Sequence, residues 1–183
     1  MGLYTGCRLE ELCQLYISDL TEVDGIWCLN IVEDKPDKSV KTGEKRIVPL
    51  HPFIIEDLNF VGYVRGLPDQ AGRVFPELKR INHRYGHYFG RWFSTFREKS
   101  GIDSPPRKKS FHSFRHTAIN HLKQNDVPEH YIAELVGHST QSITMGRYGK
   151  KYRPDKLMEQ VVLKLDYGID LSHLKNSKYV MRD

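Results

Sequence analysis

Two short segments in the first third of this chain have the character of β-strands, whereas most of the remaining sequence is patterned for helices. Residues 25–32 form a run rich in β-branched and aromatic side chains, and residues 45–49 form a second run that ends at a proline. The polar segment between them, residues 33–43, predicts a hairpin or a third short strand. These features favour an α+β fold, mostly helical, with a small antiparallel sheet or hairpin on one edge.

Helical periodicity covers much of the rest. We predict helices at residues 8–17, 51–66, 82–99, 111–124, 128–135, 142–148 and 155–165. In the helix at 82–99, aromatic residues recur at helical spacing, and we interpret this aromatic face as core rather than as a base-stacking platform. The face consists of Tyr85, Tyr88, Phe89, Trp92, Phe93 and Phe96. At 183 residues, the chain can bury the core of one domain.

The helix at 111–124 contains a pattern with chemical content, His112-Ser-Phe-Arg115. Residues three apart share one helix face, because three residues is close to one turn. A guanidinium there can hold two oxygens of a phosphate, and an imidazole beside it can move a proton. His138, in Gly-His-Ser, and Tyr148 would complete a set suited to nucleophilic attack on a phosphodiester. Each residue alone is better explained as an ordinary surface or core side chain, so the combination makes the argument.

Two further motifs precede this set. Arg8 lies in Thr-Gly-Cys-Arg-Leu-Glu-Glu-Leu, and Lys41 begins Lys-Thr-Gly-Glu-Lys-Arg-Ile-Val-Pro-Leu. Together with the His-x-x-Arg pattern, Gly-His-Ser and the tyrosine, in this order, they resemble the catalytic domain of the tyrosine recombinases, the phage-integrase family. The resemblance extends to about Tyr148, and five motifs in the right order are far more specific than any one of them.

The resemblance implies a site-specific DNA recombinase or integrase with an integrase-like DNA breaking-rejoining fold. In that family the tyrosine, here Tyr148, attacks a DNA phosphodiester and forms a 3′-phosphotyrosyl intermediate. Arg8 and Arg115 would neutralise the phosphate oxygens. His112 would help to take the proton from the tyrosine, and Lys41 would donate a proton to the leaving 5′-oxygen.

By the same resemblance, His138 would hydrogen-bond the phosphate, and the reaction would need no metal, ATP or other cofactor. The sequence leaves alternatives for two roles. Lys35, Lys38 and Lys45 compete with Lys41, which is preferred for its spacing to Val-Pro-Leu. Tyr152 is the second candidate for the nucleophile.

The expected partner is double-stranded DNA. The formal net charge of +5 favours a polyanion without requiring one. Arg107, Lys108 and Lys109 lie in a basic loop before the helix at 111–124 and are placed to contact backbone phosphates. The resemblance adds other protomers of the same protein, assembled as a tetramer on DNA, and accessory DNA-bending or directionality proteins.

The three cysteines form no Cys-x-x-Cys pair and indicate reduced thiols in a cytoplasmic protein, bacterial or phage-encoded and acting at the nucleoid. No apolar run approaches the roughly 20 residues that a membrane helix needs, so no membrane partner is expected. The histidine pairs His83/His87 and His112/His116 have metal-ligand spacing but no evident third ligand, and we predict no metal site.

The chain starts seven residues before Arg8, whereas family members have an N-terminal DNA-binding domain and one more catalytic-domain helix. We therefore expect residues 1–183 to be a catalytic-domain fragment that binds DNA poorly alone. Residues 154–183 form a predicted C-terminal helix and tail, which would dock on a neighbouring protomer or cap its own chain.

Three rival functions make different predictions. A type IB topoisomerase would relax supercoils without site preference. A catalytically inactive DNA-binding accessory protein would lack one or more of the six residues, and all six are present. A metal-dependent nuclease using the nine histidines would be stopped by a chelator, whereas a tyrosine recombinase would cleave in EDTA.

Overall fold

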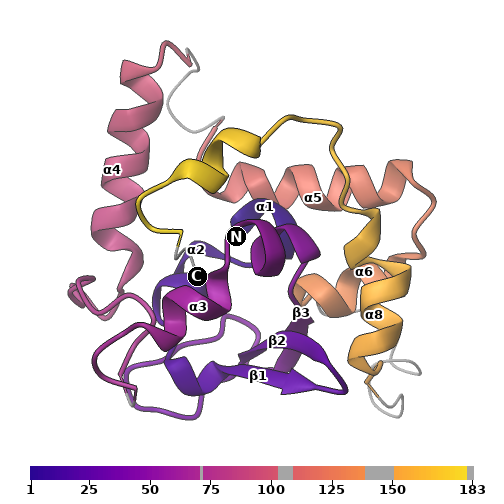
Figure 1. Ribbon diagram of the computed structural model, residues 1–183, viewed down its shortest axis with the longest axis horizontal. Coiled ribbons are helices and arrows are strands. Elements are labelled where there is room, and N and C mark those ends of the chain that lie inside the picture. The colour runs from indigo at the N-terminus through magenta and orange to yellow at the C-terminus, as the bar shows by residue number, and fades with distance from the viewer. Residues whose placement is uncertain (71, 103–108, 139–150, 181–183) are drawn as a thin grey trace.

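A computed structural model describes residues 1–70, 72–102, 109–138 and 151–180 of the protein (Figure 1). A small sheet lies at one edge, and helices surround the N-terminal segment (Figure 1). The α-helices described are α1 (Gly2–Thr5), α2 (Leu9–Cys13), α3 (Phe60–Arg65), α4 (Gly86–Lys99), α5 (His112–Gln124), α6 (Glu129–Val136) and α8 (Pro154–Gln160). Short 3-10 turns occur at Ile17–Asp19, Val162–Lys164 and Ser172–Asn176.

The sheet has three antiparallel strands in the order β1-β2-β3. The two predicted strands are confirmed as β2 (Ile26–Ile31) and β3 (Arg46–Pro49), which pair from Cys28↔Pro49 to Ile31↔Arg46. Of the two alternatives for residues 33–43, the hairpin is confirmed, because this segment connects the antiparallel neighbours β2 and β3. The third strand is instead β1 (Leu20–Val23), which precedes β2. Asp24 and Gly25, both with positive φ, make the two-residue turn that joins β1 to β2.

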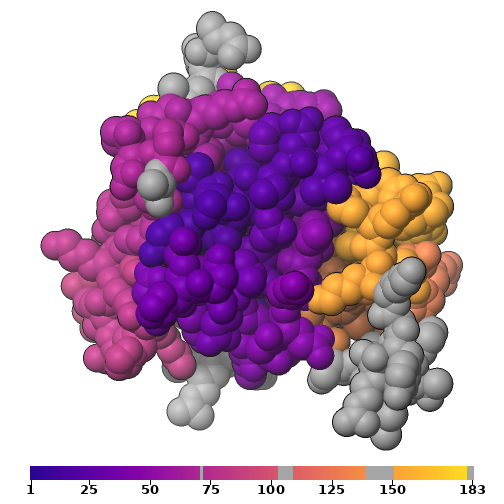
Figure 2. Space-filling model, turned by 90° about the horizontal axis from the view of Figure 1, so that it is seen from below, coloured from indigo at the N-terminus to yellow at the C-terminus, as the bar shows by residue number. Residues whose placement is uncertain are grey.

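The helices at 111–124 and 128–135 are confirmed as α5 and α6. Ala118 and Leu122 on α5 are fully buried, as their spacing predicts. The α6 helix follows Pro128 and ends at Gly137, whose φ of 68° is the left-handed conformation that suits glycine at a helix C-terminus. Seen from below, residues of the N-terminal half fill the middle of the face, between α4 on one side and α6 and α8 on the other (Figure 2).

Four other predicted helices are shorter than expected. The helix at 82–99 begins only at Gly86, as α4. The helix at 8–17 is only α2, and Thr5-Gly6 ends α1 instead of starting α2, since Gly6 adopts φ 60°. The predicted helix at 51–66 divides into a π-helical turn, Phe53–Asp57, and α3, because Asn59 takes a left-handed conformation and caps α3. The predicted helix at 155–165 is α8 followed by a 3-10 turn.

The prediction that the aromatic face of residues 82–99 is core is wrong for three of its six members. Tyr88, Trp92 and Phe96 are 47%, 55% and 49% exposed. The helix extends away from the body of the molecule (Figure 1), so this side of it has no described covering element. Phe89 and Phe93, on the other side, pack edge-on against Phe111 with ring centroids 5.6 and 5.9 Å apart.

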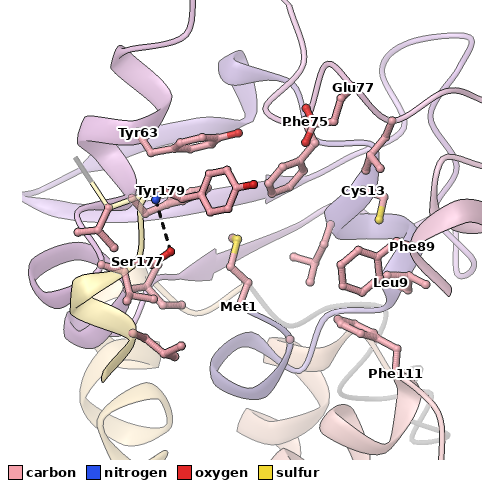
Figure 3. A pocket seen from close by; sticks show the side chains of 18 residues that line it. Met1, Leu9, Cys13, Tyr63, Phe75, Glu77, Phe89, Phe111, Ser177 and Tyr179 are labelled. Atoms are coloured by element: carbon pink, nitrogen blue, oxygen red, sulfur yellow. Dashed lines mark hydrogen bonds between the residues drawn. The ribbon is translucent and has the colours of Figure 1, made fainter. Parts of the chain in front are cut away.

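The C-terminal tail folds back on its own chain. Lys175 forms an ion pair with Asp57, and the Tyr167 hydroxyl donates to the Leu3 carbonyl at 2.7 Å. The end of the tail borders an apolar cavity of about 550 Å³, with Met1 and Tyr179 on its wall (Figure 3). None of the described site residues lines this cavity.

Candidate active site

Arg8 is the N-cap residue of α2, immediately after the glycine turn that ends α1. Its backbone N–H donates to Glu11 Oε2 at 2.8 Å, and its Nη1 donates to Glu11 Oε1 at 2.9 Å. The first of these bonds is one half of a capping box, in which the side chain three residues into the helix accepts from the N-cap backbone N–H. The arginine side chain has no acceptor for the other half and forms an ion pair with the same carboxylate instead. The carboxylate therefore fixes the arginine where its outer edge stays accessible, with 18% of the side chain exposed.

Arg115 approaches from α5 and is almost completely buried, at 1% exposure. Its Nη1 donates to the Gly6 carbonyl at 2.8 Å, two residues before Arg8. Its Nη2 is buried and has no hydrogen-bond partner among the described residues. An unpaired buried guanidinium donor is costly and is a group that an anionic ligand would satisfy.

Gly137 and His138 reach the same place from the end of α6. Arg8 Nη2 is 3.5 Å from the Gly137 carbonyl, which precedes His138. The two contacts Arg115–Gly6 and Arg8–Gly137 thus join the Arg8 motif to two motifs that lie more than one hundred residues further along the chain. The structure brings the predicted Arg8, Arg115, His112 and His138 into one cluster.

Electrostatics within this cluster are strongly positive. Burial and the neighbouring Arg8 charge lower the pKa of Arg115 to about 10. Burial, followed by the charges of Arg115 and Arg8, lowers the pKa of His138 from its ordinary value. The pKa of His112 is lowered by burial and then by His116 and the two arginines. The positive charges of the two arginines, held close to these imidazoles, create a site for an anion.

Lys41 lies in an exposed turn, Val40–Gly43, closed by a 2.8 Å bond from the Gly43 N–H to the Val40 carbonyl. Its charge also contributes to the lowered pKa of His112, so it faces the same cluster. Lys38 is excluded as an alternative, because its side chain is 1% exposed and its ammonium is paired with Asp19 at 2.7 Å. Lys35 lies over the Tyr16 ring, 4.7 Å from its centroid.

Two residues behind the cluster were not predicted from the sequence to belong to the site. Glu11 is 2% exposed and accepts hydrogen bonds from both Arg8 and Arg46. Arg46, the first residue of β3, is only 5% exposed although it is charged. A glutamate three residues after Arg8 is a sequence signal for helix capping. Nothing in the sequence predicted that Arg46 would contact this glutamate.

Several predicted site residues fall outside the described residues, namely Tyr148 and the basic-loop residues Arg107 and Lys108. Lys109 is exposed, and its carbonyl accepts a 2.7 Å hydrogen bond from Arg97 on α4. The second tyrosine candidate, Tyr152, packs on the Tyr131 ring with centroids 4.4 Å apart.

The described residues contain no group of three or more histidine, cysteine, aspartate or glutamate side chains that could hold a metal ion. Within the same ranges, no helix has both the length and the apolar character that a membrane crossing requires.

Comparisons with known proteins agree with the geometry of the candidate site. The sequence model of the phage integrase family matches residues 1–153. The chain belongs to the phage integrase family. This integrase-family chain is 26% identical over 146 residues to a tyrosine recombinase of Agathobacter rectalis, covering 76% of the chain and 42% of the relative. It is 28% identical over 143 residues to the tyrosine recombinase XerA of Pyrococcus furiosus, covering 76% and 44%.

Two solved structures of a site-specific recombinase share the fold. The XerH site-specific recombinase bound to its difH substrate, in a pre-cleavage complex, matches with a TM-score of 0.53 and 21% identity, over 76% of this chain and 38% of XerH. Its post-cleavage complex with palindromic difH matches with a TM-score of 0.51 and 20% identity, over 86% and 42%. The predicted α+β, integrase-like fold is confirmed. The chain spans less than half the length of these relatives.

Proposed function

We propose that this chain is the strand-cleaving part of a site-specific DNA recombinase of the tyrosine type. The observation that supports the proposal most strongly is the cluster of Arg8 and Arg115, in which the buried Arg115 Nη2 is unpaired among the described residues and the charges of both arginines lower the pKa of His112 and His138. Such a cluster matches the charge and the donor geometry of one phosphodiester.

In the proposed reaction, the Tyr148 Oη attacks the phosphorus, forming an O–P bond as the bond to the 5′-oxygen breaks. His112 accepts the tyrosine proton, and its lowered pKa favours the neutral imidazole that a base must be at neutral pH. Lys41 donates a proton to the leaving 5′-oxygen. The two arginines and His138 donate to the non-bridging oxygens. Because these side chains supply every proton, the proposal includes neither metal nor ATP.

Tyr148 is preferred to Tyr152 as the nucleophile because of the surroundings of Tyr152. The Tyr152 ring is held against Tyr131, and its backbone N–H donates to Glu134 Oε1 at 2.8 Å. Burial, Tyr131 and Glu134 raise the pKa of Tyr152, which makes its hydroxyl harder to activate.

The partners follow from the chemistry. Rejoining to a new strand needs the 5′-hydroxyl of a second cleaved strand, and hence a second protomer, so the proposal includes assembly of copies, as a tetramer, on double-stranded DNA. Lys109 and its neighbours Arg107 and Lys108 are proposed phosphate contacts. The three free cysteines, all buried, fit a reducing cytoplasm.

A nicked suicide substrate tests the function. Mixed with the chain at micromolar concentration in EDTA, it should give a covalent protein–DNA adduct on a denaturing gel. Tyr148→Phe should abolish the adduct, and the matched control Tyr152→Phe should retain it. Failure of the chain to form any adduct, dependence on a divalent cation, or equal adduct in Tyr148→Phe would each contradict the proposal.

A further inference from the structure

Arg46, on β3, is a buried cation whose contacts all lead toward the candidate active site. Its Nη2 donates to Glu11 Oε2 at 2.7 Å, and its Nη1 donates to Glu11 Oε1 at 3.2 Å. Its Nε donates to the Leu135 carbonyl at 3.0 Å, in the last turn of α6. A Cβ on Gly137 would lie 2.8 Å from Nη1, so the guanidinium also packs against the turn before His138.

These contacts connect elements that contribute different site residues. Through Glu11, Arg46 is joined to Arg8, because the same carboxylate accepts hydrogen bonds from both guanidinium groups. Through Leu135, it is joined to the end of α6, after which His138 follows. One planar fork therefore spans the N-cap of α2 and the C-terminus of α6.

We propose that Arg46 is a positioning residue, which sets the relative placement of Arg8 and His138 around the scissile phosphate. The inference rests on the proposed function for its consequence in cleavage, but its structural part stands on the contacts alone. Arg46 would not touch the substrate, since it is 5% exposed and its guanidinium is occupied by protein acceptors.

A purely structural ion pair would not need this arrangement. Burying an Arg–Glu pair costs desolvation, and an apolar pair of similar size commonly gives equal or greater stability. A lysine could neutralise Glu11, but its single point charge cannot hold the carboxylate and the Leu135 carbonyl together as a fixed fork can. The arrangement thus favours geometry over stability as the function of Arg46.

Glu11 provides a direct readout of the coupling. It faces the guanidinium groups of Arg8 on its own element, Arg46 on β3 and Arg115 on α5, together with the Cys7 thiol. Burial opposes its ionisation, but the hydrogen bond and charge of Arg46, followed by those of Arg8, bring its pKa below the ordinary value. Removing the Arg46 guanidinium should therefore raise the pKa of Glu11.

The test compares Arg46→Met, Arg46→Lys and Val48→Ala in the whole chain. Val48, two residues further on the same face of β3 and fully buried, is the control for lost stability without lost coupling. NMR of the glutamate carboxyl carbon follows the Glu11 titration, and the Arg8 Nε–H and His138 imidazole signals follow placement. Single-turnover cleavage of the suicide substrate at saturating DNA follows chemistry.

We expect Arg46→Met to raise the Glu11 pKa, to shift the Arg8 and His138 signals and to slow cleavage roughly 100-fold, the effect of about 1 Å of misplacement. The slow variant should also lose cleavage at a higher pH than the unaltered chain as the solution is acidified. Arg46→Lys should restore part of the rate, and Val48→Ala should leave the titration and both signals unchanged.

Equal Glu11 titrations in Arg46→Met and the unaltered chain, or matching signal shifts in Val48→Ala, would overturn the proposal. If Arg46→Met does not fold, the signals and rate of Arg46→Lys decide, and a rate equal to that of the unaltered chain overturns it. Absence of cleavage by the unaltered chain would instead contradict the proposed function, while the NMR result would still decide whether Arg46 positions Arg8 and His138.

Discussion

Replacing Lys38 with methionine should destabilise the protein strongly, whereas the same change at Lys41 should not. The Lys38 ammonium lies 2.7 Å from Asp19 Oδ1 and 2.8 Å from Asp34 Oδ1, and the side chains of Lys38 and Asp19 are 1% and 3% exposed. Removing one member of a buried pair leaves an uncompensated charge, at a cost of about 3–5 kcal/mol. Lys41 is exposed, so its replacement should change stability by less than about 0.5 kcal/mol.

Urea unfolding followed by tryptophan fluorescence measures the difference. With a urea dependence of roughly 2 kcal/mol per molar, Lys38→Met should lower the midpoint by about 2 M. A loss below about 1 kcal/mol for Lys38→Met, or a similar loss for Lys41→Met, would refute the assignment of Lys38 to the core.

The same two variants separate structure from chemistry. Lys41→Met should slow strand cleavage by about 10²- to 10⁴-fold, because the leaving 5′-oxygen loses its proton donor. A substrate with sulfur in place of that oxygen needs little protonation and should restore the rate. If sulfur gives no rescue in Lys41→Met, Lys41 is not the general acid.

Three further outcomes are expected. Gly137→Ala should destabilise the protein more than its control, Gly101→Ala. Both glycines have positive φ, which costs about 1–2 kcal/mol for alanine. Only a Cβ at Gly137 would also meet a neighbouring atom, Arg46 Nη1, at 2.8 Å. Trp92→Gln should change the free energy of unfolding by less than about 0.5 kcal/mol. Thermal stability should fall as the pH drops below 6.5, the ordinary pKa of histidine, and again below 4.5, the ordinary pKa of glutamate. Folding lowers the pKa of both His138 and Glu11, so below these pH values the unfolded chain binds protons that the folded chain does not.

Denaturant titrations and scanning calorimetry across pH check these three. Equal costs for the two glycine variants would contradict the close approach of Gly137 to its neighbour. A large loss in Trp92→Gln would mean that the exposed face of α4 is covered in solution. Stability that rises on acidification from pH 7 to 5.5 would contradict the lowered histidine pKa values.

Local sequence pattern predicted the elements whose conformation depends mainly on residues adjacent in the sequence. The strand pair at 26–31 and 46–49 and the helices α5 and α6 follow from alternation, helical period and end signals such as Pro128 and Gly137. The β1–β2 hairpin, which was not predicted, also has a local signal, because Asp24-Gly25 is a sequence typical of a two-residue turn.

Other features depend on which element packs against a given face, and the local sequence pattern does not specify that. The period of α4 shows that Tyr88, Trp92 and Phe96 share a face but not whether another element covers it. In the candidate site, motif order predicted that Arg8 and Arg115 would converge. The meeting of Arg46 with Glu11 and Leu135 depends instead on tertiary contacts between elements distant in sequence.

In the proposed site, two arginines and two histidines from separate motifs surround one anion. NMR titration of His112 and His138 in increasing sulfate, a dianion throughout the relevant pH range, tests this most directly, with chloride at equal ionic strength as the control. Their pKa values are lowered by burial and by surrounding positive charge, so bound sulfate should raise both. Titration curves that are identical in sulfate and chloride would contradict the claim.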